Sequence, residues 1–240
     1  MVEIPQSHPR YLSLKMREVL VEGVEEGITS KAGLIAHGRG EMFDYLIGEE
    51  SIKTAKMAER KAIAKMMEAE NPVISINGNV AALVPEEIVE LGKRLDAKLE
   101  VNLFHRTNER ISKIKRFLEL NGAEKVYGLD PEEEIPGLDH KRALCSHDGI
   151  YTSDVVLVPL EDGDRAQALN EMGKTVITID LNPLSRTSKA ADITIVDNVV
   201  RAVPNMLELE PLYEEFDNAE NLKETLLFMS KRLKTLSEEI

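Results

Sequence analysis

The chain lacks the features that mark secreted and membrane proteins. It has no tryptophan and one cysteine, Cys145, so no disulfide bond can form within it. Disulfides are typical of oxidising compartments, and a reducing setting is therefore expected. No stretch approaches the roughly 20 apolar residues that a membrane-spanning helix needs. The first ten residues lack the apolar core of a secretory signal peptide. We expect a cytoplasmic protein with no membrane partner.

Positive charge is also scarce. The 240 residues include 43 acidic and 30 basic side chains, which gives a formal net charge of -13. Such a surface repels the phosphodiester backbone, so nucleic acid is not expected as a partner. The charge does not exclude small anionic substrates, because a few arginines can make a positive pocket inside an acidic shell.

Several common site motifs are missing. The glycine-rich segment GLIAHGRGE (33–41) matches neither the P-loop pattern GxxxxGK[ST] nor the dinucleotide pattern GxGxxG. No GxSxG hydrolase motif occurs, and no His and Cys cluster has the spacing of a zinc site. A thiol nucleophile at Cys145, beside His147, is one interpretation, and a free, partly buried thiol is the other.

Hydrophobic periodicity predicts a helical first third followed by alternating strands and helices. Helices are expected at 10–26 and 51–70, with a turn leading into a short helix at 31–50. Strands are expected at 73–77, 98–104, 123–129, 154–160, 174–180 and 192–198. The remaining predicted elements are helices at 85–95, 108–120, 164–172 and 185–190, a long loop at 131–153 and an amphipathic helix at 219–240.

This alternation predicts βαβ units and a largely parallel sheet flanked by helices. The runs VVLVP and VITI are almost wholly apolar, as expected of strands covered on both faces. The expected fold class is α/β, with one domain over 1–240. We expect it to comprise an N-terminal helical annex (1–72), a parallel-sheet core (73–210) and a C-terminal helix (211–240).

Ligands of parallel sheets bind at the carboxyl ends of the strands. That rule selects five short polar loops, and their joint placement predicts one site. The loops contain Asn77, Gly78 and Asn79; His105, Arg106 and Thr107; Glu161, Asp162, Gly163 and Asp164; Asp180, Asn182, Ser185, Arg186 and Thr187; and Asp197 and Asn198.

Each of the first three loops has two interpretations. The 77–79 loop can bring the backbone close to a ligand or form a tight turn. The 105–106 pair can bind a phosphate or carboxylate, or it can be a solvent-exposed part of the loop. The acidic group at 161–164 can hold Mg²⁺ or cap the following helix.

The segment 178–198, TIDLNPLSRTSKAADITIVDN, is the most informative. Its polar residues follow a strand and meet the start of a helix, where free N–H groups favour a phosphate. The pattern predicts a nucleotide or phosphorylated ligand, with a structural crossover as the alternative. His37 and Arg39 lie between glycines and can enter a crowded phosphate site. Arg17 can join them or form a surface salt bridge.

Long blocks of the sequence resemble one family. These blocks are SHPRYLSLKMRE (7–18), KAGLIAHGRGEMFDYLIGE (31–49), INGNVAALVP (76–85), VVLVPLEDGDR (155–165) and TIDLNPLSRTSKAADITIVDNVVRA (178–202). They resemble the archaeal 4-phosphopantoate–β-alanine ligases, also called phosphopantothenate synthetases. The resemblance covers nearly the whole chain, with little of it at 124–152 and in the C-terminal helix.

The resemblance implies a Rossmann-like homodimer that joins 4-phosphopantoate to β-alanine with ATP in coenzyme A biosynthesis, releasing AMP and diphosphate. An acyl-adenylate would activate the carboxylate, with Mg²⁺ on the phosphates. It implies ATP contacts at Arg17, Arg39, Asp180, Leu181, Asn182, Arg186, Thr187, Asn198 and Val199. For the acid we expect contacts at His37, Asn77, Gly78, Asn79, His105 and Arg106, and for a metal at Glu161, Asp162 and Asp164.

Other functions stay open on sequence alone. A phosphosugar isomerase or nucleotide-sugar enzyme would use a similar sheet without ATP. A non-catalytic sensor would bind ATP or AMP at the same strand ends, whereas a structural scaffold leaves the five polar loops unexplained. The leucines and methionines of the terminal helices suit either a dimer face or packing within the annex.

Overall fold

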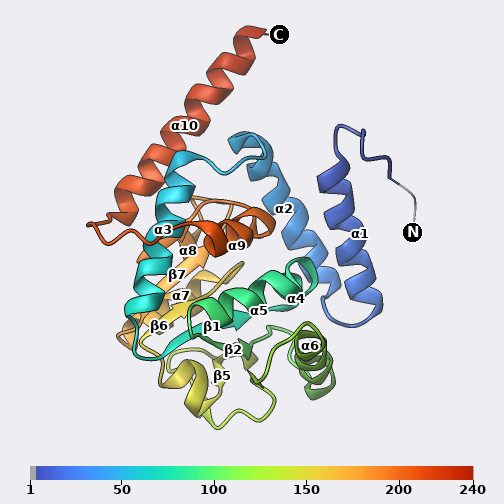
Figure 1. Cartoon of the computed structure of the whole chain (residues 1–240), viewed down its shortest axis with the longest axis vertical. Coiled ribbons are helices and arrows are strands. Elements are labelled where there is room, and N and C mark those ends of the chain that lie inside the picture. The colour runs from blue at the N-terminus through green and yellow to red at the C-terminus, as the bar shows by residue number, and fades with distance from the viewer. Residues whose placement is uncertain (1–3, 240) are drawn as a thin grey trace.

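The computed structural model describes residues 4–239 and is built around a six-stranded sheet (Figure 1). All neighbouring strands are parallel, in the order β3-β2-β1-β6-β7-β8. This is the strand order of doubly wound, Rossmann-like folds, and it confirms the predicted fold class. The strands are β1 (Pro72–Ile76), β2 (Lys98–Val101), β3 (Val126–Tyr127), β6 (Val155–Leu157), β7 (Thr175–Ile179) and β8 (Ile193–Ile195).

Alternate side chains of these strands pack into two separate hydrophobic cores, one on each face of the sheet. Ile74 of β1 belongs to a large cluster with α3 (Lys53–Glu68), α5 (Pro85–Arg94), α6 (Asn108–Leu120) and α9 (Val199–Glu208). Its neighbour Val73 belongs to a second cluster on the other face, with α7 (Gly163–Glu171) and the segment 131–153. Burial on both faces explains why these strands are nearly continuous apolar runs.

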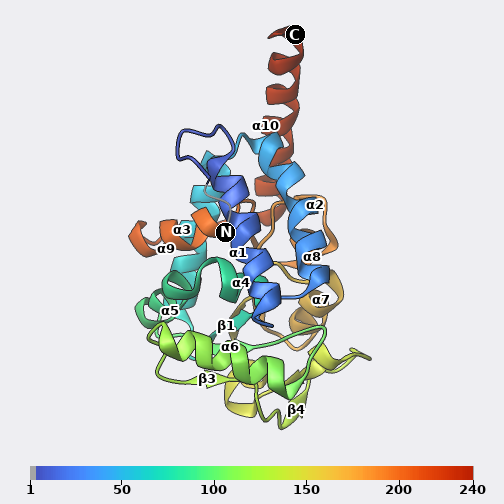
Figure 2. The ribbon, with the colours of Figure 1, turned by 90° about the vertical axis from the view of Figure 1, so that its right-hand side faces the viewer.

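The N-terminal annex packs onto the ends of the last two strands. It contains α1 (Tyr11–Glu25) and α2 (Lys31–Ile47), and α2 contacts both α1 and the C-terminal helix α10 (Asn218–Glu239). A third apolar cluster joins α2, α3 and α10 to Leu181 and Val196, which follow β7 and β8. The far half of α10 extends beyond the body of the molecule (Figures 1 and 2). The division of the chain into annex, core and C-terminal helix stays a prediction.

The prediction of a turn and a short helix at 31–50 is wrong. Residues 31–47 form one long helix, which begins where the Ser30 side chain accepts a hydrogen bond from Gly33 N and ends at Gly48 with φ 92°. Each glycine inside the helix costs about 1 kcal/mol relative to alanine. Packing against α1 and α10 outweighs that cost, so tertiary contacts decide the outcome.

Other boundaries also differ from the predictions. The strands expected at 98–104 and 123–129 are shorter in the structure, where they span Lys98–Val101 and Val126–Tyr127. The edge strand β3 pairs with β2 only at Leu99 and Glu100. A short helix α4 (Gly78–Leu83) precedes α5, and α9 occupies a stretch for which no element was expected. The helices predicted at 10–26, 51–70, 108–120 and 164–172 are confirmed within a few residues.

The segment 131–153 is more ordered than the predicted loop. It contains the antiparallel pair β4 (Glu133–Glu134) and β5 (Leu144–Cys145), a 3-10 turn at Lys141–Ala143 and a π turn at His147–Tyr151. Its anchor is the buried carboxylate of Glu100 on β2, which accepts hydrogen bonds from Ser146 N (2.8 Å) and Ile150 N (2.7 Å). Burial raises the pKa of Glu100 to about 6 in spite of these bonds.

Glu41 of α2 connects α1 to α2. Its carboxylate accepts hydrogen bonds from Ser13 and from Arg17 (Nη2, 2.5 Å) of α1, and from the Tyr45 hydroxyl (2.7 Å). Burial alone would raise the pKa of Glu41, but these bonds outweigh burial and hold it at about 2. The ionised carboxylate is therefore the form that the folded chain prefers.

We predict that Glu41→Gln lowers the free energy of unfolding by roughly 2–3 kcal/mol at neutral pH. Because the folded pKa lies below the ordinary glutamate value of 4.5, this contribution is complete above pH 4.5 and is lost as the pH falls toward 2. Urea denaturation of both proteins at several pH values measures the difference. The control is Glu22→Gln, at an exposed position of α1. An effect of Glu41→Gln that does not change with pH would contradict this assignment.

Candidate functional site

A cavity of about 770 Å³ lies at the carboxyl ends of five of the strands, covered by α2. Residues that follow β1, β2, β6, β7 and β8 all line it, so the five polar loops selected from the sequence share one site. Successive strands are added on one side of β1 up to β3 and on its other side from β6 onward. The switch point therefore lies between β1 and β6, and doubly wound folds bind ligands at such a point. The site therefore follows from the topology of the sheet.

One half of the cavity, here called the β7–β8 side, is formed by the loops after β7 and β8 and by α2. Asp180 accepts hydrogen bonds from Asn182 N (2.9 Å) and from the Ser185 hydroxyl (2.5 Å), which fixes the turn. Burial raises the pKa of Asp180, partly offset by the Ser185 bond. The predicted residues that line this side are Arg39, Asp180, Leu181, Asn182, Arg186, Thr187, Asn198 and Val199.

Asn198 connects this side to the annex. Its side-chain amide donates to Asp44 Oδ2 (2.8 Å), and its carbonyl oxygen accepts from Val200 N (3.3 Å) at the start of α9. Arg201 of α9 lies 2.6 Å from Asp44 and 2.6 Å from Asp197. This charged cluster holds α2, which carries Arg39, against the end of β8.

The other half, here called the β1–β2 side, is formed by the loops after β1 and β2. Asn77 Oδ1 accepts from Asn79 N (3.0 Å) and Val80 N (3.1 Å), so Asn77 caps α4. Asn79 donates to Gly33 O (2.9 Å) and accepts from the Thr29 hydroxyl. The 77–79 loop thus has both predicted roles: it makes a local turn and it lines the cavity. The predicted residues on this side are Asn77, Gly78, Asn79 and His105.

His37 of α2 also lines the cavity and has an unsatisfied nitrogen. Its Nε2 is buried and has no hydrogen-bond partner among residues 4–239. Burial lowers the pKa of His37, which favours the neutral imidazole at physiological pH. A ligand group in the cavity can supply the missing partner.

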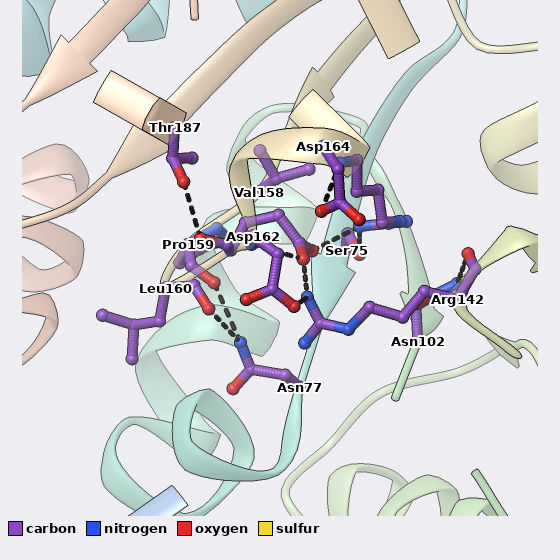
Figure 3. A network of polar contacts seen from close by, with 12 residues as sticks. Ser75, Asn77, Asn102, Arg142, Val158, Pro159, Leu160, Asp162, Asp164 and Thr187 are labelled. Carbon is purple, nitrogen blue, oxygen red and sulfur yellow. Dashed lines mark hydrogen bonds and ion pairs between the residues drawn. The ribbon is translucent and has the colours of Figure 1, made fainter. Parts of the chain in front are cut away.

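Between the two sides lies the loop after β6, which is held by a charge network (Figure 3). The Glu161 carboxylate pairs with Arg142 and with Arg165, and Arg142 also lies 3.0 Å from Asp162 Oδ2. Asn77 donates to Pro159 O (2.9 Å), and the Thr187 hydroxyl donates to Glu161 O (2.8 Å). These bonds connect the loops after β1 and β7 to the loop after β6.

Arg142 brings a buried cation to this junction. Its side chain is 8% exposed, and its Nε has no hydrogen-bond partner in the part of the chain that the structure describes. Burial and, second to it, the nearby charge of Arg165 lower the pKa of Arg142 to about 10. Arg142 remains charged at neutral pH, and its charge is shared between Glu161 and Asp162.

Five predicted residues do not line the cavity. Two of them are Thr107, which caps α6, and Asp197, which pairs with Arg201. The other three make the following contacts. Arg17 pairs with Glu41 and does not line the cavity. Arg106 is buried and donates to the carbonyl oxygens of Gly128 and Leu129. Asp164 accepts from Arg165 N (2.9 Å) and lies 2.9 Å from His140 Nε2.

The candidate metal ligands are largely occupied. The Glu161 carboxylate is shared between two arginines and Asp164 contacts His140, while Asp162 is half exposed beside Arg142. Among residues 4–239 no group of three or more His, Cys, Asp or Glu is arranged to hold a metal ion. Asp162 occupies the cap position of α7, but its side chain makes no capping bond, contrary to the expectation for this acidic group.

Sequence reasoning missed two arginines of the cavity, Arg110 and Arg142. Arg110 lies in the first turn of α6, and Arg142 lies in the segment predicted to be a loop, so the strand-end rule selects neither. Cys145 is a buried free thiol whose pKa is raised by burial to about 12, and it does not line the cavity. No described helix is both long and apolar enough to cross a membrane.

We predict that Gly163→Ala disturbs the site. A Cβ at this position would lie 2.4 Å from Arg186 Cβ and 3.0 Å from Thr187 N, so the start of α8 (Arg186–Ala190) would have to move. Overpacking of this kind costs roughly 1–3 kcal/mol, which thermal or urea denaturation measures.

The matched control is Gly38→Ala in α2, where an added Cβ meets no atom within 4 Å. Alanine is favoured over glycine inside a helix by about 0.5–1 kcal/mol, so this variant should be more stable than the parent chain. Equal effects of the two substitutions would contradict the close packing at Gly163.

Comparisons with known proteins agree with this architecture. The sequence profile of the family described as phosphopantothenate/pantothenate synthetase matches residues 54–238. A protein of Thermococcus kodakarensis named 4-phosphopantoate–beta-alanine ligase is 56% identical over 100% of this chain and 97% of its own length. Proteins of the same name from Methanosarcina mazei and Methanospirillum hungatei are 54% and 49% identical over 100% and 96% of the chain, and over 99% and 98% of their own lengths.

The relatives are archaeal and match from end to end, and the family profile covers the sheet and every strand that contributes to the cavity. The chain therefore belongs to the phosphopantothenate/pantothenate synthetase family, and it is a ligase that forms an amide bond.

Proposed function

We propose that the chain joins 4-phosphopantoate to β-alanine at the expense of ATP, through an acyl-adenylate, in cytoplasmic coenzyme A biosynthesis. The observation that carries this proposal is the cavity across the switch point of the sheet. Two polar sides flank a cationic junction at Arg142, an arrangement that suits two anionic ligands meeting in the middle. The full-length relatives named for this reaction support the same substrates.

ATP is assigned to the β7–β8 side. Arg39 and Arg186 line this side, and neither forms an ion pair within residues 4–239. Unpaired guanidinium groups suit phosphates, since the planar fork binds two oxygens. Asp180 and Asn182 add fixed hydrogen-bonding groups beside them. Arg17, expected as an ATP contact, would have to leave Glu41 to reach the nucleotide.

The acid is assigned to the β1–β2 side, with its carboxylate directed toward the loop after β6. In the first step a carboxylate oxygen attacks the α-phosphorus, and diphosphate leaves. In the second step the amine of β-alanine attacks the acyl carbon, and AMP leaves with one of the original carboxylate oxygens. The protein supplies position and charge stabilisation for both steps. Arg142 stands at the junction where negative charge develops.

Mg²⁺ is proposed to arrive on the phosphates of ATP. The residues that the structure describes contain no carboxylate cage, and all three candidate carboxylates already pair with basic side chains. Among the three, the half-exposed Asp162 has an oxygen left for an additional contact. A metal held mainly by the nucleotide fits this donor set.

We also propose that two copies of the chain associate. Leu12, Ile35 and Met42 are 71%, 68% and 64% exposed on α1 and α2, and Leu227 and Leu233 are exposed on α10. Apolar side chains on adjoining helices are typical of surfaces that pair.

The product analysis tests the reaction. When the chain is incubated with ATP, Mg²⁺, 4-phosphopantoate and β-alanine, AMP and diphosphate should form in proportion to 4′-phosphopantothenate. Diphosphate should also exchange into ATP when the acid is present and β-alanine is absent. Formation of ADP would contradict the adenylate route, and no nucleotide consumption by folded protein would contradict the ligase assignment.

We predict that Arg186→Met lowers kcat/KM for ATP by about 100-fold, because a charge that stabilises the phosphates is lost. Steady-state kinetics with ATP varied measures the effect. The control is Lys189→Met, an exposed position of the same short helix that does not line the cavity. Equal kinetics of the two variants would contradict the assignment of Arg186.

A further inference from the structure

Arg110 is a cation without a matching anion. It lies on α6 and lines both the main cavity and a smaller neighbouring cavity of about 280 Å³. No carboxylate pairs with it among residues 4–239, and burial lowers the pKa of its guanidinium without an opposing acid. A partly buried, unmatched charge is costly unless a ligand supplies the counter-charge.

The guanidinium is fixed in place by backbone carbonyls. Its Nε and Nη2 donate to Ile28 O (3.2 and 3.0 Å), and its Nη1 donates to His105 O (3.3 Å). An arginine side chain has five N–H groups, so three bonds leave one N–H on each terminal nitrogen. Two N–H groups of one guanidinium can bind two oxygens of a phosphate.

Gly78 makes room for this arrangement. A Cβ at Gly78 would lie 2.5 Å from Arg110 Nη2 and 2.4 Å from Ile28 O, so no other residue lets the guanidinium reach its position. In Figure 2, α6 runs beneath the connection from α1 to α2, which contains Ile28. The glycine of the 77–79 loop thus accommodates an arginine, which sequence reasoning did not foresee.

The surroundings of Arg110 favour an anion. The smaller cavity is lined by Thr29, Ser30, Thr107 and Lys113, besides His105 and Arg110. Ser30 and Thr107 cap α2 and α6, so two long helices begin there. Helix N-termini carry partial positive charge and add to the field of the arginine. The one acid in the wall, Glu109, is 80% exposed and pairs with Lys113.

The position also suits the length of the acid. Two strand spacings separate β2 from β6, which is roughly 10 Å across the sheet. An acid whose carboxylate lies at the loop after β6 can therefore extend its other end over β1 toward Arg110. Leu103, Phe104 and Leu160 line the cavity between these points and offer apolar contact to the two methyl groups of pantoate.

We propose that Arg110 binds the phosphoryl group of the acid and so determines that the chain uses 4-phosphopantoate rather than unphosphorylated pantoate. The family description includes both products, so the choice between them is a property of the individual site. This proposal rests on the proposed function and specifies which residue selects the substrate.

The test compares kcat/KM for the two acids at saturating ATP and β-alanine. Arg110→Met should lower kcat/KM for 4-phosphopantoate by about 30-fold or more, since a charge-assisted pair is lost, and should change that for pantoate little. The preference for the phosphorylated acid therefore falls. Arg116→Met, an exposed position of the same helix outside both cavities, should keep the preference.

Two further measurements keep the outcome decisive. Unchanged ATP binding by Arg110→Met shows that this variant is folded. If Arg110→Met does not fold, Arg110→Lys takes its place, because lysine keeps the charge but lacks the planar guanidinium that binds two oxygens. Calorimetry of each acid with the parent chain, without β-alanine, separates this proposal from the reaction. Tighter binding of 4-phosphopantoate that disappears in the variant supports the proposal even without turnover. If the ratio of kcat/KM for 4-phosphopantoate to that for pantoate stays within about threefold of the parent value in Arg110→Met, the proposal is overturned.

Discussion

The carboxylate of Glu161, held between Arg142 and Arg165, is the interaction on which the site depends. Arg165 is fully buried beneath the sheet and also lies 3.2 Å from the Ser75 hydroxyl of β1. Burial lowers the pKa of Arg165 to about 10, and the side chain stays charged. Glu161 matches the charge of this buried guanidinium, although its Nε and Nη2 have no hydrogen-bond partner among residues 4–239. A buried charge that loses its partner is costly, so Glu161 is held to the core. The loop after β6 is therefore fixed, and the second arginine, Arg142, is presented to the cavity.

This anchor divides the cavity into two sides and joins them. Thr187 from the β7–β8 side and Asn77 from the β1–β2 side both hydrogen-bond to the loop after β6. The segment 131–153 is also held through Asn102, which donates to Arg142 O (3.2 Å). The two sides of the cavity therefore adjoin at the pair of Arg142 and Glu161. In the proposed reaction this is where the carboxylate of the acid approaches the α-phosphate of ATP.

Much of the fold and part of the site could be predicted from the sequence. Apolar runs such as VVLVP identify buried parallel strands, and the strand-end rule then places Asn77, His105 and Asp180 at one edge. Features that depend on tertiary contacts could not be predicted. The helix α2 forms in spite of its glycines because α1 and α10 pack on it, and Arg110 and Arg142 reach the cavity from positions that no strand end marks. Arg106, selected because it follows a strand, instead binds buried carbonyl oxygens.

The central claim is that the carboxylate of the acid attacks the α-phosphate of ATP within this one cavity. The most direct measurement uses 4-phosphopantoate labelled with ¹⁸O in its carboxyl group, followed by mass spectrometry of the products after one turnover with β-alanine. The account predicts one ¹⁸O atom in AMP and none in diphosphate. Label in inorganic phosphate, with ADP as the nucleotide product, would contradict it, as would AMP that carries no label.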